Sequence, residues 1–433
     1  MSTAPGASAP LADWLDYIDQ LHPREIDLGL ERVRTVAGKL LPDPVAPLVI
    51  TVAGTNGKGS CVHGVARALS HSGFRVGVYT SPHVEQFNER IVVAGNPVED
   101  RLICTALDRV EASRGSVSLS YFEFATLAAF DIFVDAGLDA VVLEVGLGGR
   151  LDAVNLLDAD ISLLTSISLD HMNWLGPDRD TIGKEKVAIA RTGRPLVCGD
   201  RDLPATVSRY GKQIGARLFR LGNEFDIQPT GVDGAWSWRG LNADGKPITV
   251  EALKPQTQIP DNLATVLQTL ALLRLPFDES LLRELTALQI PGRFEWRRDS
   301  SLDTRVLLDV AHNPASAECL ATRLAALATM PRPLVAVLAI MADKDIESMV
   351  AALQTQVDIW YIAQVDEERC MPVQELAKRL AQSDSARVIE QFTDAQVAYK
   401  AACQTAGADG LVLVTGSFHT VGAVRPLTRQ AAA

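Results

Sequence analysis

The chain has 433 residues, 47% of them hydrophobic, and a formal net charge of −12 at pH 7. A single hydrophobic core stops growing at roughly 250–300 residues, so this length favours two domains. The acidic balance provides no overall attraction to nucleic acid or to anionic lipid, and we expect neither as a partner. Any polyphosphate would have to be bound by local features of the fold.

The sequence is typical of a cytoplasmic protein. No apolar run reaches the ~18 residues of a membrane span, and the first residues lack the charged and apolar regions of a secretory signal. The six cysteines include no C-x-x-C pair. A long chain without a secretory segment fits a reducing compartment.

The first part of the chain alternates between strand-like and helix-like segments. Short apolar, β-branched runs predict strands at 48–52, 76–79, 140–145, 161–165 and 195–198, and helical patterns cover 58–72 and 122–136. Continuous apolar strands separated by helices predict a parallel sheet that is covered on both faces.

The pattern changes between about Leu218 and Pro260, where turn residues separate short alternating runs. This pattern predicts small antiparallel strands, followed by a helix at 262–273. Strand-like runs then return at 305–310, 334–338, 359–362 and 411–415, with helices at 315–326 and 373–381. We therefore predict an α/β fold with two domains: a P-loop-type, doubly wound, mostly parallel domain at 1–290, and a smaller Rossmann-like domain at 291–433.

The sharpest local motif is Gly54-Thr-Asn-Gly-Lys-Gly-Ser60, between a predicted strand and a predicted helix. Its glycines let backbone N–H groups approach phosphate oxygens, and the helix N-terminus and Lys58 add positive charge. The motif departs from G-x-x-x-x-G-K-[ST], because Val52 stands where the first glycine would be and Gly59 follows the lysine. A glycine-rich turn without a ligand is the alternative, but the flanking elements favour a phosphate loop. Kinases and GTPases use such loops too, so the loop alone does not name the reaction.

Polar residues follow several of the predicted strands. Ser81, Glu144 and His171 each lie beyond a strand end, and the carboxyl ends of parallel strands face one crevice. A hydroxyl, a carboxylate and an imidazole suit Mg²⁺ that bridges ATP phosphates. Each residue alone could be a turn serine, a helix cap or a core histidine, and only their joint placement favours a site.

Eight segments together carry a family resemblance that spans almost the whole chain. They are Ile26-Asp-Leu-Gly-Leu-Glu-Arg32, Gly54–Ser60, Ser81-Pro-His83, Glu144-Val-Gly-Leu-Gly-Gly-Arg-Leu-Asp152, Asp170-His171, Pro291-Gly-Arg-Phe294, Asp309-Val-Ala-His-Asn-Pro314 and Gly416-Ser-Phe-His-Thr-Val-Gly422. The chain resembles the folylpolyglutamate synthase family, specifically its bacterial bifunctional dihydrofolate synthase/folylpolyglutamate synthase members. That family is related to the muramyl ligases, which share the Gly-Thr-Asn-Gly-Lys loop.

The resemblance implies roles for individual residues. ATP would be bound by Thr55, Asn56, Gly57, Lys58, Gly59, Ser60, Asn262, Arg293, Asp309 and His312. Mg²⁺, expected as two ions, would be held by Ser81, Glu144, His171 and Lys186, the last carrying a carbamate made from CO₂. The catalytic group would be Lys58, His171 and Lys186. The pterin would contact Glu25, Ile26, Asp27, Leu28, Ser120, Tyr121, Phe122, Glu123, Leu151, Asp152 and Ala153. From the sequence alone, Lys186 could equally be an exposed helix lysine beside Glu185, and Arg293 a surface arginine in a linker.

The implied reaction is an ATP-dependent ligation. The γ-phosphoryl group would pass to the carboxylate of dihydropteroate or of a reduced folate, and the amine of L-glutamate would attack the resulting acyl phosphate. We expect a monomeric enzyme with these small molecules as its partners. A muramyl-type peptide ligase, a monofunctional folylpolyglutamate synthase, an ATPase without ligation and a non-catalytic nucleotide-binding protein are the alternatives. The segment Ile26-Asp-Leu-Gly-Leu30 favours the folate branch.

Overall fold

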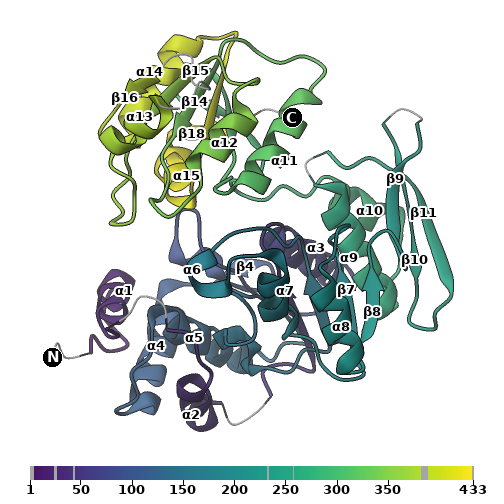
Figure 1. Cartoon of the computed structure of the whole chain (residues 1–433). Coiled ribbons are helices and arrows are strands. Elements are labelled where there is room, and N and C mark those ends of the chain that lie inside the picture. The colour runs from purple at the N-terminus through teal and green to yellow at the C-terminus, as the bar shows by residue number, and fades with distance from the viewer. Residues whose placement is uncertain are drawn as a thin grey trace. The chain divides into compact units, whose positions relative to one another are not determined.

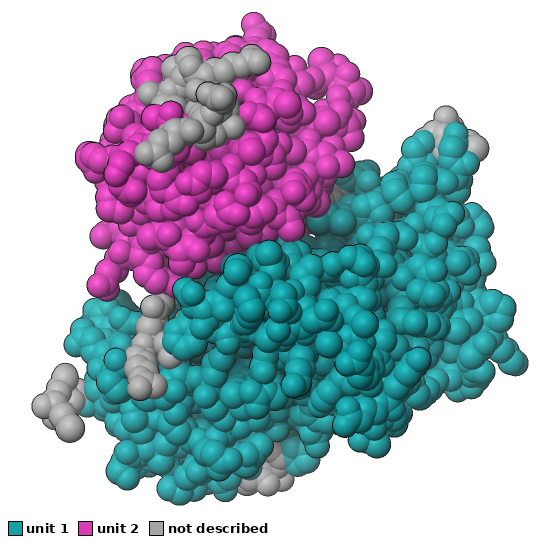
Figure 2. All heavy atoms as spheres, in the orientation of Figure 1, with its two compact units in different colours: residues 1–288 teal, residues 289–433 magenta. Residues whose placement is uncertain are grey.

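The computed structural model describes residues 4–23, 27–41, 44–231, 234–256, 258–381 and 389–431. The chain divides into two compact units, Met1–Leu288 and Gln289–Ala433 (Figure 2). Each unit has its own sheet, and each is described by itself below.

Unit 1 is built on a sheet that has eight strands within the described residues, in the order β4-β3-β2-β5-β1-β6-β7-β8 (Figure 1). The strands are β1 (Leu48–Ala53), β2 (Val76–Tyr79), β3 (Ile91–Val93), β4 (Asn96–Pro97), β5 (Ala140–Glu144), β6 (Ile161–Leu164), β7 (Pro195–Cys198) and β8 (Arg217–Arg220). The pairs from β2 to β8 are parallel, whereas β3 and β4 form an antiparallel extension at one side. The five strands predicted in this part of the chain all belong to the sheet.

Helices cover both faces of this sheet. They are α1 (Leu11–Asp19), α2 (Glu31–Leu40), α3 (Lys58–His71), α4 (Asp100–Arg114), α5 (Tyr121–Ala136), α6 (Met172–Leu175), α7 (Arg179–Val187), α8 (Ala205–Gln213), α9 (Pro260–Leu273) and α10 (Glu279–Thr286), with the short 3₁₀ helices η1 (Phe87–Arg90) and η2 (Ala153–Leu156). One core holds side chains of α1, α2, α4, α5 and α7, and the other holds those of α3, α9 and α10. Successive strand residues alternate between the two cores, as Val141 and Val142 do, because side chains of a strand point to opposite faces.

A small antiparallel sheet, β11-β10-β9, packs against α9 on the second of these cores. It consists of β9 (Asp226–Pro229), β10 (Trp236–Leu241) and β11 (Pro247–Leu253). The predicted antiparallel region began too early, near Leu218. Residues 217–220 form β8, which follows helix α8 and pairs in parallel with β7, so this segment completes a strand–helix–strand unit of the main sheet.

Unit 2 contains a sheet with seven strands among its described residues, in the order β16-β15-β14-β17-β13-β12-β18. Its strands are β12 (Glu295–Asp299), β13 (Arg305–Leu308), β14 (Leu334–Leu338), β15 (Ile359–Ile362), β16 (Ile389–Gln391), β17 (Leu411–Thr415) and β18 (Thr428–Gln430). Its helices are α11 (Pro314–Ala325), α12 (Ile346–Leu353), α13 (Val373–Ala381), α14 (Ala395–Ala406) and α15 (Phe418–Val424), with the 3₁₀ helix η3 (Arg425–Leu427). The sheet is parallel from β16 to β13 and antiparallel at β12 and β18. The two α/β units confirm the predicted fold class.

No helix in the described part of the chain is long and apolar enough to cross a membrane.

Candidate functional site

Four loops of unit 1 leave the sheet at one edge, which we call the carboxyl edge because its parallel strands end there. Strands β2, β5, β1 and β6 are consecutive neighbours in the sheet. Tyr79 of β2 pairs with Leu143 of β5, and Glu144 at the end of β5 pairs with Val52 of β1. The topology therefore brings the segment at Ser81, the carboxylate of Glu144 and the loop at 54–60 to the same edge, as expected for parallel strands.

The phosphate loop places its lysine beside the carboxylate of Glu144. Gly57 has a positive φ of 91° and immediately precedes α3, which begins at Lys58. Lys58 Nζ donates to the Thr55 carbonyl at 3.2 Å and lies 4.0 Å from Glu144 Oε1. Both side chains are largely buried, so their charges act in a medium that screens them less than water does.

The loop is fastened to the segment that follows β6. The Thr55 N–H donates to the Ser166 carbonyl at 2.7 Å, and the Ser168 N–H donates to Thr55 Oγ1 at 3.0 Å. A side chain at Gly54 would collide with Thr165, since a Cβ there would lie 1.8 Å from its Oγ1. These contacts fix the backbone of the loop before any ligand arrives.

Asn262, near the start of α9, lies directly against the same loop. A Cβ at Gly57 would lie 2.5 Å from Asn262 Oδ1, so only glycine leaves room for this amide. The predicted nucleotide residue Asn262, distant in sequence, is thus brought to the loop by the packing of α9 on α3.

Lys186 is buried, with only 5% of its surface exposed, and its Nζ donates to the Gly54 carbonyl at 2.9 Å. Burial, helped by the positive charge of Lys58, lowers the pKa of Lys186 to about 7, against the opposing effect of the negative charges of Asp170 and Asp152. The alternative interpretation, in which Lys186 is an exposed lysine on a helix, is wrong. The reason is that the loop after β5 packs closely on α7, where a Cβ at Gly149 would lie 2.9 Å from the Lys186 carbonyl.

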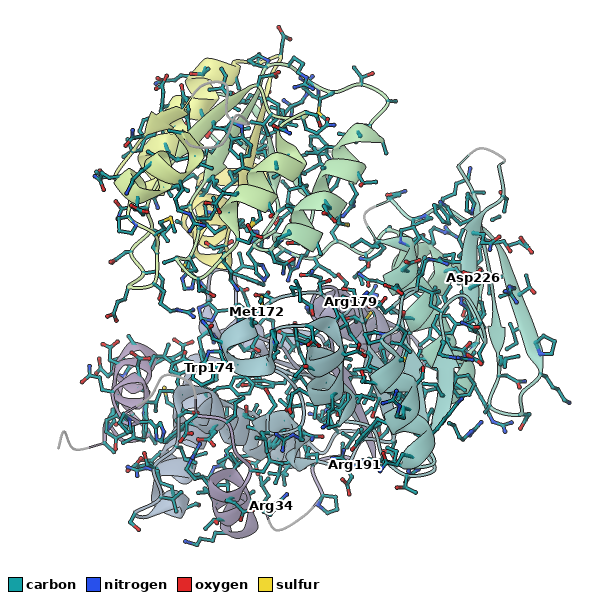
Figure 3. The ribbon with its side chains drawn as sticks, viewed as in Figure 1. Arg34, Met172, Trp174, Arg179, Arg191 and Asp226 are labelled. Atoms are coloured by element: carbon teal, nitrogen blue, oxygen red, sulfur yellow. The ribbon has the colours of Figure 1, made fainter. Side chains whose placement is uncertain are left out.

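His171 lies seven residues beyond β6 and precedes α6. Its φ is 50°, in the left-handed region, and its N–H donates to Asp170 Oδ1 at 2.8 Å. The side chains of Met172 and Trp174 on α6 are about half exposed (Figure 3). Both large apolar side chains are thus accessible beside a predicted metal ligand.

The donor set of Ser81, Glu144 and His171 suits a Mg²⁺ ion that keeps water or phosphate ligands better than it suits a metal ion held by protein side chains alone. Among the described residues, no group of three or more His, Cys, Asp and Glu side chains is placed to hold a metal ion. Mg²⁺ commonly takes one or two protein carboxylates and completes its shell with water and substrate phosphate. A hydroxyl and a single carboxylate beside a phosphate loop agree with this mode of coordination.

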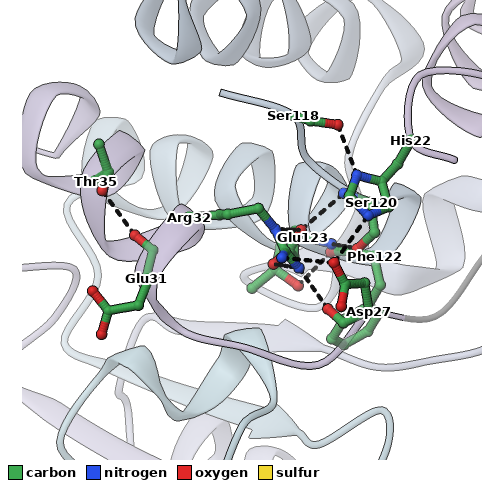
Figure 4. A network of polar contacts seen from close by, with 10 residues as sticks. His22, Asp27, Glu31, Arg32, Thr35, Ser118, Ser120, Phe122 and Glu123 are labelled. Atoms are coloured by element: carbon green, nitrogen blue, oxygen red, sulfur yellow. Dashed lines mark hydrogen bonds and ion pairs between the residues drawn. The ribbon is translucent and has the colours of Figure 1, made fainter. Parts of the chain in front are cut away.

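The predicted pterin residues lie around a network of polar contacts (Figure 4). Arg32 at the start of α2 donates to Asp27 Oδ2 at 2.7 Å and to Glu123 Oε1 at 2.9 Å. His22 contacts the same Asp27 oxygen through Nε2 at 3.1 Å and Ser118 Oγ through Nδ1 at 2.7 Å. Glu25 and Ile26 lie outside the described residues, and Leu28 is half-buried.

Several of these residues also have a structural role. Ser120 and Glu123 form a capping box at the start of α5, with the Ser120 N–H donating to Glu123 Oε2 at 2.8 Å. Asp152 is buried and accepts the N–H groups of Leu147 and Val154, both at 2.9 Å, so it connects the loop after β5 to η2. Burial raises the pKa of Asp152 to about 6 in spite of these hydrogen bonds.

Aromatic side chains lie beside this network. The rings of Tyr79 and Phe122 are 6.1 Å apart, and a Cβ at Gly146 would lie 2.7 Å from the Phe122 ring. The ring of Tyr121 meets that of Phe87 at 6.2 Å, edge to face. Leu151 is half-buried and Ala153 is buried at the start of η2. The aromatic pair predicted to face a pterin therefore lies at the N-terminus of α5, close to the loop after β5.

In unit 2, two of the predicted nucleotide residues lie beside Phe418. The guanidinium of Arg293 lies over the Phe418 ring at 4.8 Å, and the His312 ring lies 6.1 Å from it. Asp309 accepts the N–H groups of Phe294 at 2.9 Å and Ala311 at 3.0 Å. Burial raises the pKa of Asp309, and the charge of Arg293 lowers it.

Part of the polar run from Asp309 to Pro314 has a structural explanation. Asn313 caps α11 in a capping box with Ser316, and His312 Nδ1 contacts the Val310 carbonyl at 2.9 Å. This run thus shapes a strand-to-helix turn as well as offering polar groups.

Sequence reasoning missed two residues that organise these sites. Arg32 stood in a quoted segment without a role, although it joins Asp27 to Glu123. Phe418 also stood without a role, in the segment Gly416–Gly422. Its neighbours Arg293 and His312 lie more than a hundred residues away in sequence, so no local pattern could have revealed the pairing.

Comparisons with known proteins agree with these observations. A protein from Escherichia coli (strain K12) named dihydrofolate synthase/folylpolyglutamate synthase is 42% identical over 421 residues, covering 97% of this chain and 96% of its own. The structure of Escherichia coli FolC in complex with DHPP and ADP has a TM-score of 0.90, 41% identity and 98% coverage of both chains. The bifunctional folylpolyglutamate synthase/dihydrofolate synthase from Yersinia pestis, complexed with AMPPNP and Mn ion, has a TM-score of 0.88, 39% identity and coverage of 98% of this chain and 99% of that one.

The family described as Mur ligase, glutamate ligase domain, matches residues 292–418, within unit 2. These similarities confirm the resemblance inferred from the sequence motifs. This chain belongs to the dihydrofolate synthase/folylpolyglutamate synthase family.

Proposed function

We propose that this chain is an ATP-dependent ligase that joins L-glutamate to dihydropteroate and adds further glutamates to reduced folates. Its family membership supports the activity, because the Escherichia coli relative, which this chain matches over nearly its full length, is named for both synthase activities. The observation in the structure that carries the proposal is the cluster at the carboxyl edge. There Lys58 Nζ lies 4.0 Å from Glu144 Oε1, and Lys186 Nζ donates a hydrogen bond to the Gly54 carbonyl of the same loop.

The chain's own groups would bind and position the triphosphate. The backbone N–H groups at the start of α3 and the Lys58 ammonium would neutralise phosphate oxygens, which is most of what phosphoryl transfer asks of a protein. Asn262 would contact the nucleotide beside the loop, and its position against Gly57 supports this role. Arg293, Asp309 and His312 are proposed as nucleotide contacts from unit 2.

Ser81, Glu144 and His171 would hold Mg²⁺, which supplies positive charge that offsets the charge developing on the transferred phosphoryl group. Glu144 is 5% exposed, so its carboxylate is oriented by its surroundings rather than by bulk water. Lys58, 4.0 Å away, would be shared between this carboxylate and the phosphates.

Lys186 is proposed to carry a carbamate. An amine reacts with CO₂ only in its neutral form, and a pKa of about 7 gives Lys186 a substantial neutral fraction near neutral pH. The neutral nitrogen attacks the carbon of CO₂ and releases one proton, so that a neutral amine becomes an anionic carbamate. The anion would also attract Lys58, which the protonated amine repels.

Product analysis tests the proposed function. The chain is incubated with ATP, L-glutamate and either dihydropteroate or tetrahydrofolate, and the products are identified by mass. We expect dihydrofolate from the first acceptor and glutamate-extended folates from the second, with ADP and phosphate. Product from tetrahydrofolate alone would make the enzyme a monofunctional folylpolyglutamate synthase. ATP hydrolysis without any ligated product would contradict the proposal.

An isotope experiment tests the acyl phosphate. Dihydropteroate whose carboxylate carries a heavy oxygen isotope should transfer one labelled oxygen to the released phosphate, because the acyl phosphate breaks when the glutamate amine displaces phosphate. Unlabelled phosphate during productive ligation would rule out this intermediate.

The carbamate is tested by chemical rescue. Lys186→Ala should lose most of its activity and regain part of it when a small carboxylate such as formate is added, since the free anion can occupy the vacated position. Lys184→Ala, an exposed lysine of the same helix, is the matched control and should need no rescue. Failure of every small carboxylate to restore Lys186→Ala, with the variant correctly folded, would argue against a carbamate.

A further inference from the structure

Arg90 is a buried cation whose partners are aromatic and neutral. It ends η1 and is 9% exposed. Its Nε donates to His83 Nδ1 at 2.9 Å, and its guanidinium lies over the rings of Phe87 at 5.4 Å and Tyr121 at 5.5 Å. Within the described parts of the chain, no carboxylate forms an ion pair with Arg90.

A buried guanidinium without an anion is unusual, because moving a charge out of water is costly unless an opposite charge compensates it. Aromatic faces compensate only in part. The planar guanidinium also offers paired N–H donors in a geometry that matches a carboxylate. Since Nε is already bonded to His83, the remaining nitrogens are the donors available for an anion.

The backbone around Arg90 is held firmly. The carboxylate of Glu89 accepts the N–H groups of Val84, Glu85 and Gln86, each at 2.8 Å. The Thr80 N–H donates to the Arg90 carbonyl at 3.0 Å. The segment from the end of β2 to Arg90 is therefore organised before any ligand binds, as a specific binding site requires.

The position of Arg90 indicates which anion it would meet. The next residue, Ile91, pairs with Tyr79 at the end of β2, and the partner His83 lies two residues beyond Ser81, a proposed Mg²⁺ ligand. Tyr121, whose ring the guanidinium also faces, is the first residue of α5 and a proposed pterin contact. The triphosphate, in contrast, is expected at the loop after β1, and β5 separates β1 from β2 in the sheet.

The geometry points to Arg90, which faces the rings of Phe87 and Tyr121 and is hydrogen-bonded to His83, as the residue that binds the carboxylate of the pteroyl substrate. This inference rests on the proposed ligase function and deepens it. Dihydropteroate ends in a carboxylate on an aromatic ring, and a cation lined by aromatic faces accommodates both parts of that group. Arg90 would hold this anion in place for transfer of the phosphoryl group, and orientation of this kind lowers the barrier of a bimolecular step.

Equilibrium binding tests the inference without requiring turnover. The dissociation constants of dihydropteroate and of its carboxamide, which lacks the negative charge, are measured for each variant by fluorescence titration. The wild type should prefer the acid by about tenfold to a hundredfold, the range of a charge-assisted hydrogen bond. Arg90→Gln and Arg90→Met should abolish this preference, because they remove the charge. Arg90→Met also keeps an apolar stem beside the two rings.

Two further variants separate charge from packing. Arg90→Lys keeps a cation and should retain a reduced preference for the acid, which covers the case that the uncharged variants fold poorly. Arg101→Gln, an exposed arginine on α4, should behave as the wild type. A preference that survives in Arg90→Gln, or equal weakening of both ligands, would overturn the inference and make Arg90 a packing residue. A variant that raises only the KM for L-glutamate or ATP would also overturn it.

The failures of the two proposals are distinguishable. A wild type that binds neither dihydropteroate nor its carboxamide, and that yields no ligated product, would overturn the proposed function together with this inference. A wild type that forms dihydrofolate while binding acid and amide equally would leave the ligase function intact and overturn only the role of Arg90.

Discussion

Two lysines from different elements reach the phosphate loop, and their surroundings give them different chemistry. Lys58 begins α3 and lies beside Glu144, whereas Lys186 lies on α7 and donates to the Gly54 carbonyl. Burial lowers the pKa of Lys186, and the charge of Lys58 adds to this effect because two cations in a poorly hydrated region repel each other. One lysine is thus suited to bind phosphate as a cation, and the other to react as a neutral amine.

Replacing Lys58 should abolish ligation and leave the fold intact. Lys58→Ala removes the charge that would neutralise phosphate, so we expect a loss of at least about a hundredfold in kcat/KM, a typical cost of removing one electrostatic contact to a transition state. The variant's circular dichroism should match that of the wild type. Lys212→Ala, an exposed lysine in the last turn of α8, should keep full activity. Near-normal turnover of a folded Lys58→Ala would refute the phosphate-loop assignment.

Lys186 should make stability rise with pH. Its pKa is about 7 in the folded chain and 10.5 for an ordinary lysine, so between these values the unfolded chain binds a proton that the folded chain does not. Stability therefore increases with pH across this window, by up to about 1.4 kcal/mol per pH unit. In CO₂-free buffer, the gain in Tm from about pH 7 to pH 9 should be larger for the wild type than for Lys186→Met.

The matched control for this experiment is Lys184→Met, because Lys184 is exposed on the same helix. It should show the wild-type dependence on pH. The same gain in Tm for Lys186→Met and the wild type would mean that the buried amine does not titrate in this window.

At the scale of secondary elements, Arg32 links helix α2 to the N-terminus of α5. Its guanidinium contacts both carboxylate oxygens of Glu123, at 2.9 and 3.3 Å, and reaches Asp27 as well. Glu123 is buried and simultaneously caps α5 through the Ser120 N–H. The helix that presents Tyr121 and Phe122 is thus anchored to the N-terminal segment by one arginine.

Loss of this link should destabilise unit 1. In Arg32→Leu the buried carboxylate of Glu123 loses its cation, and we expect the free energy of unfolding to fall by about 2–4 kcal/mol, somewhat less than for a fully buried pair. Arg34→Leu, two residues along the same helix and well exposed, should change it by no more than about 0.5 kcal/mol. Urea denaturation of both variants gives the comparison. Equal effects would mean that the contact adds no stability.

At the scale of the whole chain, the two units have separate hydrophobic cores. Leu163 of β6 lies in a core of unit 1, and Leu413 of β17 lies in the core of unit 2, each without exposed surface. Because each core closes within its own unit, the units should unfold in separable steps.

Matched core substitutions test this independence by calorimetry. Leu163→Ala and Leu413→Ala each remove a fully buried leucine, at an expected cost of about 2–5 kcal/mol. Each should lower one thermal transition and leave the other nearly unchanged, and the two variants should affect different transitions. A single transition that both variants shift alike would show that the units unfold together.

The sequence by itself determined the elements that depend on local pattern. Apolar runs and helical periods located the main parallel strands. The motif Gly54–Ser60 was correctly placed at the junction of β1 and α3, because a phosphate loop is formed by residues that are neighbours in the chain. Motifs distributed along the chain also identified the family. Residues 217–220 were misassigned, because four residues with partial alternation do not reveal whether their partner strand is parallel or antiparallel.

Only the tertiary structure decided which distant residues meet. The burial of Lys186 arises from its contact with Gly54, 132 residues earlier, and the pairing of Arg32 with Glu123 spans 91 residues. Arg90 became notable only when its neighbours proved to be His83, Phe87 and Tyr121 rather than a carboxylate. Charge and burial are properties of three-dimensional surroundings, so the pKa of Lys186 and the unmatched charge of Arg90 follow from the order of strands and the packing of helices, which no local pattern in the sequence encodes.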